Sequence, residues 1–140
     1  MKIYQVDAFT DRPFTGNPAG VCVLPEPRPD GWMQAVAAEM NVAETAFLLW
    51  QADGFALRWF TPATEVELCG HATLASAHIL WQTGQVDREA PCRFHTASGL
   101  LTAALRGEEI ELDFPATPDE PAEAPEGLAE ILGAEVVVFR

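Results

Sequence analysis

The chain of 140 residues suits one domain and is long enough to bury a substantial core. Its composition, 49% hydrophobic and 21% charged, is that of an ordinary globular protein. A formal net charge of −13 with only eight Lys and Arg argues against nucleic acid as a partner, because phosphate binding needs clustered cations.

The cysteine content also restricts the class of protein. Cys22, Cys69 and Cys92 lie far apart and form no CxxC pair, so neither a zinc ribbon nor a disulfide framework is predicted. Reduced thiols are typical of cytoplasmic proteins, and we expect that location. The N-terminus lacks the apolar segment of a signal peptide, and no apolar run of about 18 residues predicts a membrane span.

The first part of the chain predicts two strands, a loop and a helix. Alternation over residues 2–9 indicates an opening strand, and the Pro- and Gly-rich residues 10–20 predict a loop. A short apolar strand is expected over 20–25. A helix over 30–40 follows, with Asp30 as its N-cap. The apolar face of this helix is expected to carry Trp32, Val36 and Met40.

The middle of the chain predicts a hairpin followed by a second helix. Residues 45–50 indicate a buried strand, and 55–61 its hairpin partner. A short strand over 66–68 leads into a helix over about 70–83, which Gly84 is expected to end.

This second helix is apolar almost all round, which is typical of a helix enclosed on every side. Its small residues would suit a path through a tight sheath of strands. Strands with alternating patterns are predicted over 92–98, 99–107 and 108–115. The expected fold class is therefore α+β, with mostly antiparallel strands wrapped round one central apolar helix.

A change in composition predicts a domain boundary. We expect residues 1–114 to form one lobe, and 115–127, with four Pro and four acidic residues, to be a linker. A short amphipathic turn and the first half of a strand over 135–140 follow. We interpret 115–140 as a linker and the start of a second lobe, so that the natural chain would continue.

Glu44 is the first candidate for chemistry. It lies between a helix and an apolar strand, beside Ala43, Ala46 and Phe47. Poor solvation disfavours the charged form of a carboxyl group, which is what a general acid/base at neutral pH needs. The alternative is a capping or surface glutamate at an element boundary.

His71 is the second candidate, because it follows Cys69 and Gly70 where a strand gives way to a helix. The N–H groups of a helix N-terminus favour an anion, and glycine lets a ligand approach the backbone. The residues CGHAT could thus bind a substrate carboxylate while His71 donates a hydrogen bond. The alternative is a helix-starting turn with a satisfied histidine.

The other polar residues predict no metal site. His71 and His78 would lie about 10.5 Å apart along a helix and could not share an ion. We expect His78 and His95 to be core or hydrogen-bonded histidines. Cys69 could be a nucleophile or proton carrier at a helix N-terminus, although small buried packing is the favoured interpretation. Asn17, in a glycine-containing turn, could present its amide to a ligand.

Three segments together resemble the phenazine biosynthesis PhzF family. They are YQVDAFTDRPFTGNPAGV, NVAETAFL and RWFTPATEVELCGHATLASAHIL, and their order and spacing match as well as their content. The resemblance is strong over about the first hundred residues.

The resemblance implies a fold like that of diaminopimelate epimerase, in which two similar lobes each wrap a sheet round a central helix and enclose the active site between them. It implies an isomerase that uses no metal, nucleotide or flavin. The prototype isomerises a dihydro-hydroxyanthranilate by moving a proton between carbon atoms.

By motif match, the resemblance implies that Glu44 is the acid/base and that His71 follows the substrate-binding CG pair. Gly70 and the adjoining amides, those of Ala72 and Thr73, would help to hold the substrate carboxylate, and Asn17 would lie at the same site. The family's chains are about twice this length, and the second lobe completes the site. A homodimer of this lobe is a further possibility.

Two other functions stay open at this point. The protein could be a non-catalytic PhzF-like member that binds a small ligand or a protein, because a fold does not decide function. It could also be an amino-acid racemase or epimerase based on Cys69.

Overall fold

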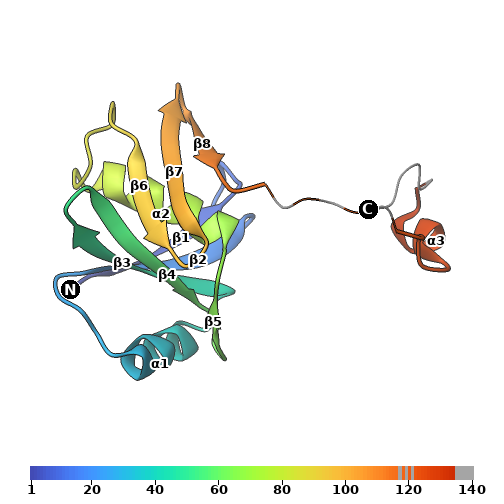
Figure 1. Cartoon of the computed structure of the whole chain (residues 1–140), viewed down its shortest axis with the longest axis horizontal. Coiled ribbons are helices and arrows are strands. Elements are labelled where there is room, and N and C mark those ends of the chain that lie inside the picture. Colours follow the sequence, from blue (N-terminus) through green and yellow to red (C-terminus); the bar gives the residue numbers. More distant parts are fainter. Residues whose placement is uncertain (117, 119, 121, 135–140) are drawn as a thin grey trace.

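The computed structural model describes residues 1–116, 118, 120 and 122–134 (Figure 1). Its elements confirm the α+β class, with one mixed sheet and one central helix. They are β1 (Ile3–Ala8), β2 (Asn17–Leu24), α1 (Asp30–Met40), β3 (Glu44–Gln51), β4 (Gly54–Phe60), β5 (Glu65–Val66), α2 (Gly70–Gln82), β6 (Cys92–Thr96), β7 (Gly99–Arg106), β8 (Glu109–Asp113) and α3 (Leu128–Leu132).

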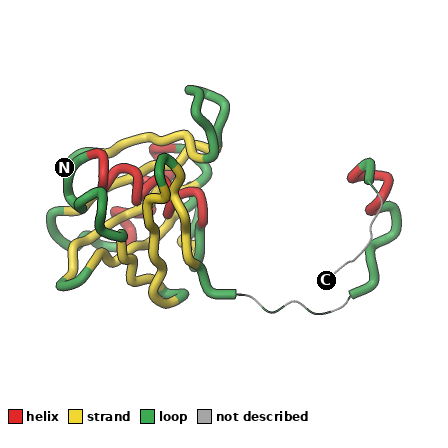
Figure 2. The backbone as a smooth tube through the Cα atoms, turned by 90° about the horizontal axis from the view of Figure 1, so that it is seen from above, coloured by secondary structure: helices red, strands yellow, loops and turns green. Residues whose placement is uncertain are grey.

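The sheet runs in the order β1-β2-β3-β4-β6-β7-β8, with β5 paired to β4. Two neighbouring pairs, β2–β3 and β4–β6, are parallel, and the others are antiparallel. The strands curve round α2, which Figures 1 and 2 show running through the middle of the lobe. The predicted hairpin is confirmed as β3–β4, with Thr45 opposite Phe60 and Gln51 opposite Gly54.

Helix α2 forms the core because small side chains let the strands approach it closely. Ala72, Ala75 and Ala77 have no exposed surface, and larger apolar side chains of the strands pack round them. The hydroxyl groups of Thr73 and Ser76 are also buried, and each donates to the carbonyl four residues earlier, at 2.6 and 2.7 Å. These bonds inside the helix satisfy the polar groups, so the core needs no other partner for them.

The prediction for His78 was wrong. Its side chain is exposed and, in the described part of the chain, makes no hydrogen bond. It lines a cavity of about 790 Å³ together with residues of β1 and of the turn and start of β8. Strands β1 and β8 are the two ends of the sheet and do not pair, so this side of α2 is left open. His95 is hydrogen-bonded as predicted, with Nε2 2.9 Å from Asp53 Oδ1.

Helix α1 covers the opposite, outer face of the sheet. Its most buried residues are Met33 and Ala37, with Trp32 and Val36 half-buried beside them, so the predicted apolar face is shifted by about one residue. The predicted cap was also wrong, since Pro29 occupies the N-cap position and Asp30 is the first helical residue.

The carboxylate of Asp30 binds the side chain of Arg58 instead of capping its own helix. Arg58 in β4 donates to Asp30 Oδ1 at 2.7 Å and to both oxygens of Glu65 at 2.6 Å. The hydrogen bond from Arg58 lowers the pKa of the Asp30 carboxyl group. This interaction ties the start of α1 to β4 and β5.

The predicted loop over 10–20 is shorter than expected, because β2 begins at Asn17. Backbone pairing with β1 extends from Ala8 opposite Asn17 to Ile3 opposite Cys22, so the ladder continues through Pro18 and Gly20. A side chain on Gly20 would meet the Thr45 hydroxyl at 2.7 Å, which explains glycine within this strand.

Two further residues differ from the prediction, one in burial and one in secondary structure. Trp50, expected in a buried strand, is 60% exposed at the end of β3. Leu68, expected on a short strand, lies outside β5 and is also exposed. Gly84 follows α2 with φ +70°, as expected for the residue that ends a helix.

Beyond β8, the short amphipathic turn is confirmed as α3, which has no buried residue. The predicted strand over 135–140 lies outside the described residues, and the division into 1–114 and 115–140 stays a prediction. Among the described helices, none is both long and apolar enough to cross a membrane.

Close approach of β4 and β6 makes Gly54 a stability determinant. A Cβ at this position would meet the Arg93 carbonyl oxygen at 2.5 Å, whereas one at Gly31 in α1 would meet nothing within 4 Å. We expect Gly54→Ala to destabilise the fold by about 1–3 kcal/mol through overpacking. Gly31→Ala should be neutral or stabilising by up to about 1 kcal/mol.

Urea unfolding followed by circular dichroism measures both variants under the same conditions. Equal unfolding midpoints for the two variants would contradict the close approach at Gly54.

Candidate active site

Glu44 is placed by the register of the sheet. As the first residue of β3, it pairs with Ala19 of the parallel strand β2. Side chains alternate along a strand, and Ala46 and Leu48 pack in the core cluster around α2. Glu44 therefore projects from the same concave face, at the end of the sheet where β3 begins.

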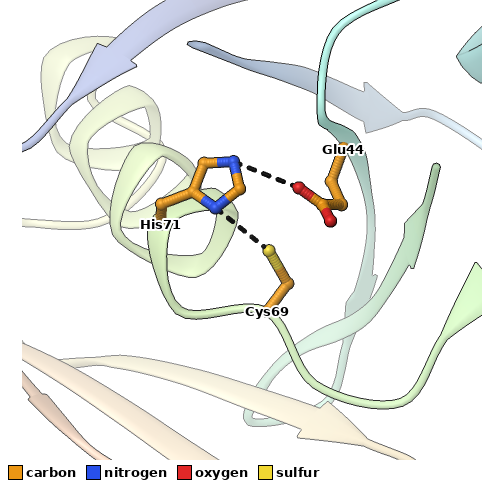
Figure 3. Close-up of side chains that lie close together, drawn as sticks. All are labelled: Glu44, Cys69 and His71. Atoms are coloured by element: carbon orange, nitrogen blue, oxygen red, sulfur yellow. Dashed lines mark hydrogen bonds and ion pairs between the residues drawn. The ribbon is translucent and has the colours of Figure 1, made fainter. Parts of the chain in front are cut away.

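His71 and Cys69 reach the same point from α2. Cys69 is the N-cap residue of this helix, with extended backbone, and His71 is its second residue. His71 Nε2 lies 3.3 Å from Glu44 Oε2, and His71 Nδ1 lies 3.3 Å from Cys69 Sγ. Figure 3 shows one ring nitrogen facing each partner. The three side chains thus form a chain from thiol to imidazole to carboxylate.

This group of side chains is only partly exposed to solvent. The side chain of His71 is 9% exposed and that of Glu44 is 21% exposed, so the carboxylate is the most accessible member. His71 Nε2 is itself buried, and its contact with Glu44 is not aligned as a hydrogen bond. Burial raises the pKa of the Cys69 thiol to about 11, and the nearby Glu44 carboxylate acts in the same direction.

The N-terminus of α2 supplies donors next to these side chains. The first N–H groups of a helix have no partner within it and favour an anion. Gly70 is half-buried, and a Cβ on it would meet only the ring of Phe114, at 3.5 Å. The backbone at this point is therefore open to a ligand.

The other expected substrate-binding residues differ in what they can offer. The side chains of Ala72 and Thr73 are fully buried. Thr73 directs both its N–H and its hydroxyl to the carbonyl of Cys69, at 3.2 and 2.6 Å. Any contact of Ala72 with substrate would be through its backbone N–H. The substrate-binding roles of both residues stay predictions.

Asn17 is exposed at the first position of β2. It lies two residues before Ala19, the partner of Glu44, and by alternation it projects from the same face of the sheet. No polar contact joins Asn17 to Glu44, His71 or Cys69 among the described residues. Its role in binding also stays a prediction.

Glu44, Cys69 and His71 are the described residues best able to hold a metal ion, with ligand atoms within 4.8 Å of one another. Thiolate, imidazole and carboxylate are ligands that zinc accepts. However, the two ring nitrogens of His71 face different partners, and one nitrogen at most could bind an ion.

Cys69 is the residue for which the sequence interpretation favoured buried packing and gave a place in the site only as an alternative. It is buried, as the packing interpretation expects, and also contacts the imidazole of His71. Its position two residues before a histidine, at a helix N-cap, was the available signal. That spacing lets the two side chains turn toward each other across the first helical turn.

Comparison with known proteins gives a consistent result. A family model described as "Phenazine biosynthesis-like protein" matches residues 6–134. An uncharacterized isomerase of Halalkalibacterium halodurans is 66% identical over 113 residues, which cover 81% of this chain and 43% of the relative. The chain spans about half the length of the curated relatives it matches.

Solved structures support the fold. A PhzF-family protein of Enterococcus faecalis superposes with a TM-score of 0.85 and 40% identity, over 97% of this chain and 52% of that one. A probable proline racemase of Agrobacterium radiobacter superposes with a TM-score of 0.58 at 17% identity, over 79% and 40% of the two chains, which shows a shared fold alone.

The thiols give a test of the packing around this site. Cys22, Cys69 and Cys92 are buried, and burial raises the pKa of each above the ordinary 9.0. Because the thiolate is the reactive form, we expect the native protein at neutral pH to react slowly with a chromogenic disulfide reagent. The unfolded protein should react rapidly at all three cysteines.

The same shifts predict a loss of stability in alkali. A thiol with a raised pKa in the folded state favours folding below its ordinary pKa, and this contribution is lost as pH rises through the folded value. The urea concentration at the unfolding midpoint should therefore decrease as the pH is raised from about 9 to about 12.

In the labelling experiment, rapid reaction of all three thiols of the native protein at neutral pH would contradict their burial.

Proposed function

Because this chain belongs to the phenazine biosynthesis-like, or PhzF, family, we propose that it is the catalytic lobe of an isomerase that moves a proton between carbon atoms of a small carboxylate substrate. The observation that carries the proposal is the position of Glu44. Its partly exposed carboxylate lies 3.3 Å from the side chain of His71, the second residue of α2, and therefore beside the N-terminus of this helix.

Each group has a part in the proposed reaction. The N–H groups around Gly70 bind the carboxylate of the substrate, and the helix dipole favours its negative charge. Glu44 removes a proton from an activated carbon atom and returns it to another, so substrate and product have the same composition. His71 donates a hydrogen bond toward the negative charge that develops between these two steps.

The lobe needs a cover for efficient chemistry. Glu44 lies at an open end of the sheet, and water at the site would weaken the electrostatic interactions on which the reaction depends. The curated relatives are about twice as long as this chain, so the second half of a full-length protein would supply the cover. A second copy of this lobe is the alternative cover.

A Cys-based epimerase is the second candidate, favoured by the contact between Cys69 and His71. The raised pKa of the thiol opposes it, since a proton-abstracting cysteine must be a thiolate.

A non-catalytic binding protein would keep the anion site at α2 without needing Glu44.

Replacing Glu44 tests the proposed acid/base role. The protein expressed from its native gene would be incubated in deuterium oxide with cyclic unsaturated and amino-acid-like carboxylates, and mass spectrometry would detect deuterium in the product. Glu44→Gln should lower turnover by about 10²–10⁴-fold while ligand binding changes little. Glu39→Gln, on the exposed side of α1, is the matched control.

Full turnover by Glu44→Gln would refute the assigned role. Loss of turnover in Cys69→Ser, with Glu44→Gln active, would instead support the Cys-based epimerase.

Replacing Gly70 tests the anion site. Gly70→Ala should fold normally, because its Cβ meets only Phe114 at ordinary contact distance. The added methyl group would keep the substrate carboxylate from the helix N–H groups, so KM should rise about tenfold, or roughly 1.4 kcal/mol of binding free energy. Gly31→Ala serves as the control, and an unchanged KM in Gly70→Ala would place the carboxylate elsewhere.

A further inference from the structure

The chemistry of His71 depends on which ring nitrogen carries its proton. A neutral imidazole has one donor and one acceptor nitrogen, and the partner of one decides the role of the other. Nε2 faces Glu44. If the ring proton is on Nε2, His71 presents a hydrogen-bond donor to the carboxylate; if it is on Nδ1, His71 presents a lone pair.

The only hydrogen-bond partner of Nδ1 among the described residues is Cys69 Sγ, at 3.3 Å. The N-cap position of Cys69 holds the thiol at this distance, because α2 begins at the next residue. A thiol can donate its single proton or accept one. The direction of this one bond therefore fixes the tautomer of His71.

We propose that Cys69 is a positioning residue for His71: its S–H donates to Nδ1, which keeps the imidazole proton on Nε2, directed at Glu44. The effect of this arrangement on turnover rests on the proposed function, whereas the tautomer itself is a property of the resting protein.

Two observations favour this direction. First, the thiol is buried, and its raised pKa means that it keeps its proton at neutral pH and can donate it to Nδ1; the Glu44 carboxylate, which also raises this pKa, is the other acceptor near the thiol. Second, the opposite tautomer would place the Nε2 lone pair 3.3 Å from a carboxylate oxygen. Two acceptors at that distance, in a site this poorly solvated, repel each other.

The surroundings of Nε2 suggest what the Nε2–H tautomer of His71 would do in the reaction. Nε2 is buried, and its contact with Glu44 is not aligned as a hydrogen bond, so this donor is unsatisfied in the resting protein. A bound substrate atom near Glu44 would satisfy it. Cys69 would thus contribute to the reaction without touching the substrate, by keeping a donor rather than an acceptor on the side of the imidazole that faces the site.

Nitrogen NMR on protein containing isotope-labelled histidine reads the tautomer directly. The chain has three histidines, so His78→Asn and His95→Asn assign the signals of His71. At neutral pH we expect the proton on Nε2 and an acceptor-type Nδ1. A proton on Nδ1, or a doubly protonated ring, would overturn the proposal.

Variants of Cys69 test the cause. Cys69→Ser keeps an O–H donor and should keep the Nε2–H tautomer, whereas Cys69→Ala, in which Glu44 alone favours that tautomer, should give a mixture with Nδ1–H. Cys92→Ala is the matched control, since it removes a buried thiol of β6 that forms no hydrogen bond to a histidine among the described residues. An unchanged tautomer in a folded Cys69→Ala protein would refute the proposal. If that variant does not fold, the wild-type and Cys69→Ser spectra decide.

In the deuterium assay, turnover should fall about tenfold in Cys69→Ala and recover in Cys69→Ser, as expected for the loss of one oriented hydrogen bond. Absence of turnover in the wild-type protein with the expected tautomer would count against the proposed function alone. Normal turnover in folded Cys69→Ala would count against the role of Cys69 alone.

Discussion

Enclosure of α2 by the curved sheet is the constraint on which the rest of the structure depends. A helix that buries nearly all its sides can be stable only if strands surround it, and its alanines have no exposed surface at all. The strands in turn need the helix, because their inner side chains form one apolar cluster with it. The polar groups of Thr73 and Ser76 fit this core because they bond within the helix.

The candidate site follows from where this enclosure ends. The inner side chains of the sheet that pack in the core cluster with α2 are apolar. Glu44 stands two residues before Ala46, at the next place on the same face, near the first turn of the helix. The helix N-terminus brings its own donors and the imidazole of His71 to that point. One packing arrangement therefore places an acid, a histidine and an anion site together.

Much of this could be predicted from the sequence because it depends on local patterns. Continuous apolar character identified α2, alternation identified the strands, and the CGH residues at a strand-to-helix junction indicated His71. Proximity of Glu44 to His71 could not be derived from spacing, because it depends on the pairing of β2 with β3; only the family resemblance suggested it.

The predictions that were wrong failed because they depended on contacts between residues far apart in the sequence. Pro18 and Gly20 predicted a loop, but pairing with β1 holds them in a strand. His78 shares its side of the helix with His71, yet is exposed because β1 and β8 do not meet, which is a property of the whole sheet. Asp30 fits the pattern of a cap, but Arg58, distant in sequence, binds its carboxylate. Each of these outcomes was decided by a contact far along the chain.

The position of Glu44 as the first residue of β3 has a consequence for how this lobe can change during evolution. Which face a side chain takes depends on whether it stands at an odd or even place along the strand. Only residues 41–43 separate α1 from β3, and Asn41 already has the left-handed backbone that ends the helix. Loops usually absorb insertions, but one added residue that shifted this strand would turn the carboxylate outward and bring Thr45 inward. This short connection beside the site should therefore keep its length while the longer loops of the lobe vary.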